Sequence, residues 1–413
     1  MKIILFIIIV LPLFLKAQSM APDHTQTLGA SEFNPNDLIM DQIECVGNET
    51  TSCDLIQKEV YLNPGDKINE EELSNTKIRL KVKNLFSSVN IFLKKGSERG
   101  HVNVVIEVQE TNPLYTELEF GATRVNDETG EHTGYGLSAG LGHRNLFGVG
   151  KVLQAKVNVS DVNSDVNKSY SIDLNYFDPH VFGSKKTFFG LTVNHSYHPY
   201  AADQLDKDIL FYGSNYQINS LRNLTNINST LGYRIFDFSY ISLGTHKSFG
   251  SYLRFDAYTD ERISPKTYES ESTSINYGWN SEDDTYFATE GSRLNLGFTK
   301  YPTQDSGFDY FALNFQKNWN WNRKHILTLG TYEGFEDFSE KVLGKFGSRT
   351  LFKYGYQFDS NVDADINKGR WYFGVNPSYS SIQGTDLSWE TGVLLEHKKY
   401  GILKLSFTNW SVR

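Results

Sequence analysis

Cysteine is scarce in this chain, and long apolar runs are absent beyond the N-terminus. Only 2 cysteines occur among 413 residues, and their spacing matches no metal-binding motif. After the first residues, no segment approaches the roughly 18 consecutive apolar residues that a transmembrane helix requires. The net charge of −9 argues against nucleic acid as a partner. These absences exclude a helical membrane protein and disfavour a nucleic-acid-binding one.

Aromatic residues, in contrast, are abundant. The chain holds 24 Tyr and 28 Phe, and 14% of all residues are aromatic. Membrane β-barrels gather such residues at the two membrane interfaces. A soluble β-sandwich has a similar composition, so composition alone leaves both classes open.

The N-terminus has the pattern of a secretory signal peptide, which we place at residues 1–17. One lysine precedes an apolar core from Ile3 to Leu15, which is too short to span a membrane as a helix. Cleavage would follow Ala17, although Leu15 departs from the small residue usual at that position. The alternative is a retained anchor. A polar linker is predicted at residues 18–37, and we expect the protein to be exported.

Residues 38–112 read as a small α+β domain with the order strand, helix, helix, strand, strand. Thr51, followed three residues later by Asp54, resembles a capping pair at the first helix. Asn69 is expected to cap the second helix, with Glu72 reaching back to it. The last two segments alternate apolar and polar residues as strands do.

Strict alternation then follows in the segment from Ser138 to Phe182. Leu153 and Val157 alternate with Gln154 and Lys156, and a second run of the same kind follows directly. Successive side chains of a strand point to opposite faces, so each run has one apolar and one polar surface. Repeated through a long chain, this pattern is typical of a membrane barrel with lipid outside and water inside.

Residues 113–413 are therefore predicted to form an antiparallel transmembrane β-barrel. Membrane strands need about 9 to 11 residues each, or about 18 to 22 with turns and loops, so this length accommodates about 14 to 16 strands. An even number is expected if both barrel ends enter from the same side. The last strand, around Leu403 and Leu405, must pair with the first, around Leu118 to Thr123. An open edge in lipid would leave amide groups unpaired at several kcal/mol each.

The small domain resembles a polypeptide-transport-associated (POTRA) domain in its segments IECVGNETT, LNPGDKINEEEL, NLFSSVNIFLKKG and GHVNVVIEVQE. The later segments HRNLFGVGKVLQAKV, YFDPHVFG and FATEGSRLNLGF are similar to barrel strands of the BamA/TamA superfamily, the bacterial surface antigen family. The resemblance implies an outer-membrane barrel with one POTRA domain in the periplasm. It also implies insertion of β-barrel proteins into the outer membrane, or movement of polypeptide across it.

In that superfamily a loop folds back into the lumen and carries an Arg-Gly-aromatic motif. The corresponding region, between Phe335 and Tyr372, has no Arg-Gly pair. By this resemblance Arg349 is the candidate loop anchor, with Lys353 and Tyr354 beside it, because a bidentate guanidinium is hard to replace. The alternative is that Arg349 is a solvated loop cation.

Cys45 and Cys53 lie eight residues apart in the small domain. In an oxidising periplasm they can form a disulfide that closes this short loop. The alternative is two buried thiols.

Signals for catalysis or cofactor binding are poor. The GVGKV segment at 148–152 lacks the first glycine and the hydroxyl residue of a phosphate loop. His195 and His198 would point to different sides of a strand. The acidic clusters at 282–284 and 359–365 are expected to be loop surface, with calcium binding as the lesser alternative. We predict no enzymatic activity and no cofactor.

The expected partners are outer-membrane lipid, unfolded polypeptide clients and periplasmic accessory proteins. An exposed edge of the small domain's sheet could receive a client by backbone pairing. Two alternatives remain: a passive pore or structural barrel that has lost assembly activity, and a secreted soluble β-sandwich.

Overall fold

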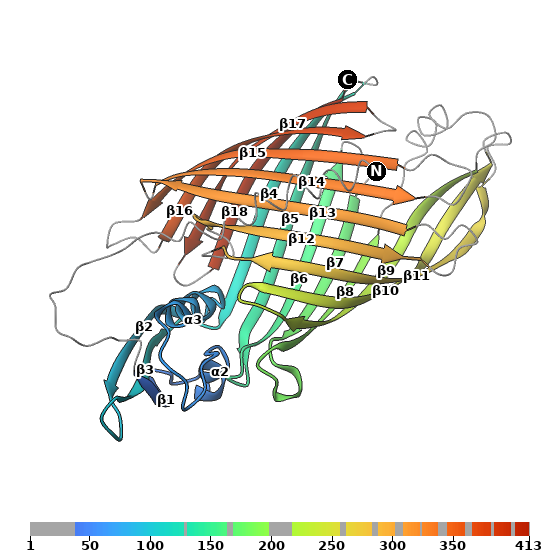
Figure 1. Cartoon of the computed structure of the whole chain (residues 1–413). Helices are drawn as coiled ribbons and strands as arrows, with labels where there is room; N and C mark the ends of the chain where they lie inside the picture. The colour runs from blue at the N-terminus through green and yellow to red at the C-terminus, as the bar shows by residue number, and fades with distance from the viewer. Residues whose placement is uncertain are drawn as a thin grey trace, which may run out of the picture.

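The computed structural model describes residues 38–127, 130–162, 168–197, 217–256, 262–282, 288–301, 309–322, 324–337, 345–359, 366–380, 384–397 and 401–412. The predicted signal peptide and linker lie outside these residues. The described chain forms a small α+β domain beside one end of a large barrel, as Figure 1 shows. No helix in this part of the chain combines the length and hydrophobicity needed to cross a membrane.

The small domain has the predicted order of elements. These are β1 (Ile39–Val46), α2 (Cys53–Lys58), α3 (Glu70–Val82), β2 (Phe86–Lys95) and β3 (His101–Glu110). The sheet order is β1-β3-β2, with β1 parallel and β2 antiparallel to β3.

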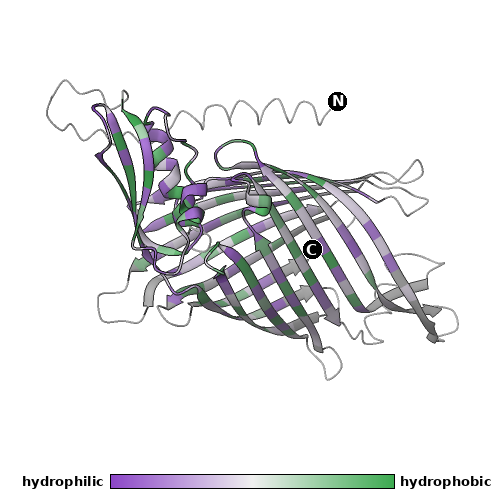
Figure 2. Ribbon diagram, turned by 90° about the horizontal axis from the view of Figure 1, so that it is seen from below, coloured by the Kyte–Doolittle hydropathy of each residue, from purple (hydrophilic) through white to green (hydrophobic). Residues whose placement is uncertain are grey.

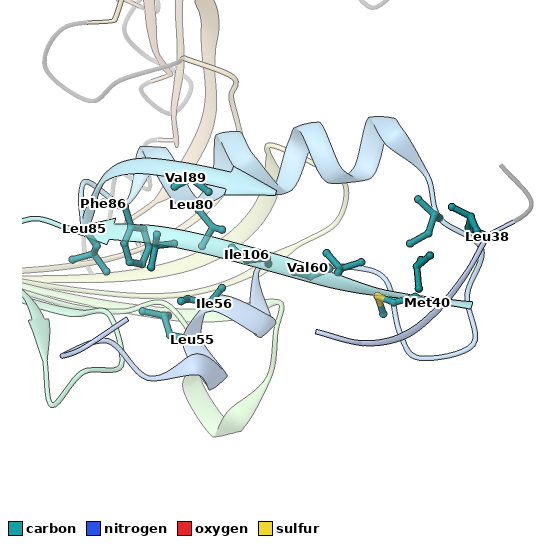
Figure 3. Packing of buried hydrophobic residues seen from close by; sticks show 14 residues of the cluster. Leu38, Met40, Leu55, Ile56, Val60, Leu80, Leu85, Phe86, Val89 and Ile106 are labelled. Carbon is teal, nitrogen blue, oxygen red and sulfur yellow. The ribbon is translucent and has the colours of Figure 1, made fainter. Parts of the chain in front are cut away.

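The helices cover one face of this sheet and bury its core. Leu55 and Ile56 of α2 and Leu80 of α3 pack with Val89 and Ile106 of the sheet (Figure 3). Each of these side chains is at most 1% exposed. Burial of such a side chain is worth about 1.5 to 3 kcal/mol, so this cluster stabilises the domain.

The helix starts differ in detail from the prediction. Asn69 caps α3, and its side chain accepts the amide hydrogen of Glu71 at 2.9 Å. The cap of α2 is Ser52 and not Thr51, whose amide is bonded to Glu110 instead. Glu72 does not reach back to Asn69, because its carboxylate accepts from the Tyr61 amide at 2.9 Å.

The larger unit is a closed barrel. Its strands are β4 (Leu114–Asp127), β5 (Gly130–Leu146), β6 (Lys151–Val162), β7 (Lys168–Asp178), β8 (Thr187–Tyr197), β9 (Gln217–Arg234), β10 (Ser239–Asp256), β11 (Arg262–Asn280), β12 (Gly291–Lys300), β13 (Asp309–Trp321), β14 (His325–Asp337), β15 (Lys345–Asp359), β16 (Ile366–Ser380), β17 (Gly384–His397) and β18 (Gly401–Val412).

Fifteen strands close the barrel in the described part of the chain, within the predicted range of 14 to 16. Consecutive strands pair antiparallel, whereas β18 pairs with β4 in parallel. The predicted pairing of the last strand with the first is confirmed, but the predicted even number is wrong. With an odd number, first and last strands run in the same direction, so β18 ends far from the small domain (Figure 1).

The wall has the two faces that alternation predicts, and Figure 2 shows the alternation along its strands. Leu153 and Ile172 point outward and are 40% and 48% exposed. On the inner face, Asn158 donates to Asp173 at 2.7 Å, and Asn194 donates to the other oxygen of Asp173 at 2.6 Å. The exterior is apolar, and the lumen wall carries hydrogen-bonded polar side chains.

Candidate functional site

The sheet of the small domain ends in an exposed edge strand. Strand β2 lies at one side of the sheet order, and no strand of the described chain pairs with its outer edge. Phe92 and Leu93 on this strand are 48% and 38% exposed. An edge of this kind offers unpaired backbone groups to an extended segment, with charged residues such as Lys94 limiting unspecific pairing.

The small domain is joined to the barrel by a partly buried ion pair. Arg79 of α3, whose side chain is 7% exposed, lies 2.9 Å from Asp237 in the turn between β9 and β10. The same guanidinium is paired with Glu72 and lies over the Tyr61 ring, 4.1 Å from its centroid. Asn75 donates to the second oxygen of Asp237 at 2.8 Å. Two side chains of α3 therefore hold one carboxylate of the barrel.

A second contact involves the turn between β7 and β8. The carboxylate of Glu59 lies 2.8 Å from the Lys83 ammonium and 2.9 Å from the Nε2 atom of His180 in this turn. Lys185, in the same turn, donates to the carbonyl of Val60 at 3.1 Å. The Glu59 and His180 side chains are each 4% exposed, so the contact excludes water.

These two buried groups predict a pH dependence of docking. Burial raises the pKa of the Glu59 carboxyl, but Lys83, His180 and Arg234 outweigh burial and hold that pKa well below 4.5, its ordinary value. Burial lowers the pKa of His180 below 6.5. The His180 shift means that the separated form binds a proton more readily than the docked form, so docking weakens as pH falls below 6.5.

We expect amide hydrogen exchange in α3 of the whole protein to accelerate between pH 7 and pH 5, after correction for the intrinsic pH dependence of exchange. His180→Gln removes the imidazole and should flatten this step. A profile of the same steepness in this variant would contradict the assignment to His180.

The turn between β5 and β6 is the third contact. The amide of Ser52 donates to the carbonyl of Gly148 at 2.8 Å, and Asn145 donates to the Thr51 hydroxyl at 2.9 Å. Gly148 has a φ of +73°, and a Cβ atom there would lie 2.6 Å from the carbonyl oxygen of Thr50. The GVGKV segment is thus a docking turn followed by the start of a strand. At position 148 a side chain larger than that of glycine would collide with the Thr50 carbonyl.

A cavity of about 350 Å³ lies where the small domain meets the inner barrel wall. It is lined from the small domain by Tyr61 and Lys83, and from the barrel by Arg144, Arg234 and Tyr240. The Arg234 guanidinium is fixed by bonds of 3.0 Å to two carbonyls of the β7–β8 turn. The mouth of the lumen is therefore bordered by cations and aromatic rings from both units.

The seam between β18 and β4 is continuous. Its register runs from Ile402 opposite Glu117 to Ser411 opposite Asn126. On the lumen side Lys404 of β18 donates to Glu119 of β4 at 2.6 Å. Lys156 of β6 reaches the other oxygen of Glu119 at 3.4 Å, so an ion-paired cluster spans the seam.

The predicted lumen-loop residues lie in the barrel wall. Arg349, Lys353 and Tyr354 are all on β15, which pairs with β14 and β16 along its length. The expected inward-folded loop is therefore wrong for residues 345–359 and 366–372, while 338–344 and 360–365 lie outside the described residues. Phe352, Tyr354 and Phe358 all face outward, which is the period of two expected for a strand. Leu351 is apolar but faces inward, and this obscures the alternation in the sequence.

These candidate residues do not form one site. The Lys353 ammonium lies over the Tyr372 ring, 3.6 Å from its centroid. Tyr354 is on the other face of the strand, where its hydroxyl lies 2.6 Å from the Nδ1 atom of His325. The structure gives no lumen anchor made of the three residues together.

The remaining candidates are placed as follows. Cys45 and Cys53 are joined in a disulfide, with their Cα atoms 5.8 Å apart. His195 lies 2.9 Å from the Thr225 hydroxyl, whereas His198 is outside the described residues. Glu282 is not loop surface, because it is 4% exposed and accepts hydrogen bonds from the wall strand β13. Residues 283–284 of the same acidic cluster and residues 360–365 of the second acidic cluster lie outside the described residues.

Comparisons with known proteins support this architecture. The POTRA family, described as "Surface antigen variable number repeat", matches residues 39–111. No curated protein matches the chain.

Among solved structures, CdiB from Escherichia coli matches with a TM-score of 0.58 and 11% identity, over 88% of this chain and 70% of its own. CdiB from Acinetobacter baumannii matches with a TM-score of 0.56 and 11% identity, over 87% and 68%. BamA from Haemophilus ducreyi lacking POTRA domains 1-3 has a TM-score of 0.48 and 12% identity, over 90% and 81%.

At such low identity the two CdiB structures show a shared fold. Combined with the family match at residues 39–111, they confirm the resemblance drawn from the sequence. This chain carries a POTRA domain at residues 39–111, and over most of its length it shares the barrel fold of the CdiB structures.

Proposed function

We propose that this protein lies in the bacterial outer membrane, with its POTRA domain in the periplasm, and handles unfolded polypeptide there. It would insert β-barrel proteins into the membrane or move polypeptide across it, with periplasmic accessory proteins as further partners. The observation that carries this proposal is the position of the POTRA domain. Its β2 edge is unpaired in the described chain, while its helix α3 is fixed at the barrel mouth.

The chemistry needed is recognition and not catalysis. Backbone pairing at a sheet edge tolerates many client sequences, because amide and carbonyl groups are common to all of them. The energy would come from burial of apolar side chains, at about 25 cal/mol per Å². We therefore propose a non-enzymatic role without cofactor or nucleotide.

A second candidate is a passive or structural barrel that has lost assembly activity. The placement of Arg349 on the wall strand β15 favours it, since the resembling superfamily uses an arginine in a lumen loop at this point. This role would need neither the β2 edge nor a client.

A photo-crosslinking amino acid at Phe92 separates these roles. We expect it to capture unfolded polypeptide in living cells, because this side chain is 48% exposed beside the unpaired edge. The same group at Glu98, in the hairpin tip of the POTRA domain, is the control and should capture little. Depletion of the protein should then lower the amount of assembled barrel proteins or of exported polypeptide. Normal levels of both after depletion would favour the passive barrel.

A further inference from the structure

The turns that hold the POTRA domain each carry a phenylalanine with an exposed ring. Phe147 in the β5–β6 turn is 88% exposed, and Phe182 in the β7–β8 turn is 91% exposed. Phe236 in the β9–β10 turn is 70% exposed. Within the described chain, nothing covers these rings. They belong to consecutive hairpins at the end of the barrel where the POTRA domain lies.

The backbone at two of these positions is unfavourable for phenylalanine. Phe147 has a φ of +60° and Phe182 a φ of +57°. This left-handed region suits glycine or asparagine, and a bulky residue there is strained. In the β13–β14 turn the left-handed residue is Asn322, with a φ of +57°. The turn conformation therefore does not require phenylalanine, and the exposed ring points to a contact outside the chain.

Each turn has two sides with different surroundings. One side contacts the POTRA domain through polar groups, namely the Gly148 carbonyl, Lys185 and Asp237. The other side exposes the ring. A substitution of the ring alone therefore leaves the docking contacts in place.

The exposed rings continue the apolar exterior of the barrel. Next to the β9–β10 turn, Tyr233, Ile241 and Leu243 are 52%, 44% and 61% exposed on the outer face. Aromatic side chains partition favourably into the interfacial layer of a bilayer, between head groups and acyl chains. A lipid surface at this end of the barrel would reach from these strands to the turns.

We propose that Phe147, Phe182 and Phe236 form a lipid-anchoring rim, which inserts into the interfacial layer of the leaflet on the POTRA side. Because the same turns hold the POTRA domain, the rim fixes the height and orientation of that domain above the membrane. This inference rests on the proposed membrane location. It names a lipid surface, and not a protein, as the partner of these rings.

The test uses the whole protein reconstituted into phosphatidylcholine vesicles. Phe147→Cys, Phe182→Cys and Phe236→Cys are each labelled with an environment-sensitive fluorophore, and lipids carrying a nitroxide near the glycerol backbone act as quencher. Leu243→Cys on the outer barrel face is the positive control, and Glu98→Cys on the distal POTRA hairpin is the aqueous control. We expect at least twofold stronger quenching at the three rim positions than at Glu98.

The outcomes are distinguishable. If Leu243 is not quenched, the membrane location itself fails. If Leu243 is quenched while the rim positions behave like Glu98, the rim is not in lipid and the inference is overturned. Protection of the rim labels only after addition of periplasmic proteins would also overturn it, because a protein would then cover the rings. Unchanged heat-modifiable migration of the labelled variants verifies folding.

Discussion

Replacing Arg79 by alanine is expected to separate the POTRA domain from the barrel mouth. The substitution leaves Glu72 and Asp237 without the guanidinium that pairs with both. It also removes the bond from Arg79 to the carbonyl of Glu59 and the ring contact with Tyr61. Removing one partner of a fully buried ion pair costs roughly 3 to 5 kcal/mol, and the loss at this interface is smaller because the Asp237 side chain is 33% exposed. The hydrogen bonds of Ser52 with Gly148 and of Lys185 with Val60 remain in the variant and set the residual docking.

Hydrogen exchange of the whole protein measures this release. Amides of α3 and of the turn at 235–238 should exchange faster by one to two orders of magnitude in the variant. Each factor of ten corresponds to a loss of roughly 1.4 kcal/mol in the free energy of opening. Asp237→Ala removes only the barrel side of the pair and leaves Arg79 bound to Glu72, so it should accelerate the same amides without destabilising the POTRA core. Lys81→Ala, on the exposed side of α3, is the matched control. Unchanged exchange in the Asp237 variant would contradict the docking role.

The local parts of this fold could be predicted from the sequence, and the contacts between distant parts could not. The outward orientation of Leu153 follows from the alternation of apolar and polar residues, which depends only on neighbouring positions in the sequence. The pairing of the last strand, around Leu405, with the first, around Phe120, follows from the need to close an edge in lipid. The parallel direction of that pairing depends on whether the number of strands is odd or even. The chain length gives only a range for that number.

The docking residues show the limit most clearly. Arg79 and Asp237 are separated by 158 positions, and neither stands in a local motif. A charged residue on a helix is expected to be exposed to solvent unless the surface that it contacts is known. Likewise, Glu119 follows the polar face of its strand, but its pairing with Lys404 requires the seam register.

A disulfide across the seam is expected to leave activity intact. Gly121 and Ser406 are opposite each other in the parallel pairing of β4 and β18. A Cβ atom on Gly121 would lie 3.3 Å from the Ser406 hydroxyl oxygen, so cysteines at both positions are within disulfide reach. Ser138 and Asn158 are the matched pair inside the wall, on β5 and β6.

The reason for this expectation is the cost of opening the seam. A client that enters through it must separate the pairing from Ile402 to Ser411 and break the pair of Lys404 with Glu119. Each backbone bond exposed to lipid without a partner costs several kcal/mol, so opening requires a replacement strand at every step. Handling of polypeptide at the POTRA edge and the barrel mouth needs no such exchange.

Transport or assembly assays of the oxidised Gly121→Cys/Ser406→Cys variant decide between these routes. Activity equal to that of the oxidised Ser138→Cys/Asn158→Cys control means that the seam stays closed during function. Loss of activity in the seam variant alone, with recovery on reduction, would assign insertion to the seam and overturn the expectation. The control pair also reports any effect of reduction on the native bond between Cys45 and Cys53, since both variants carry it.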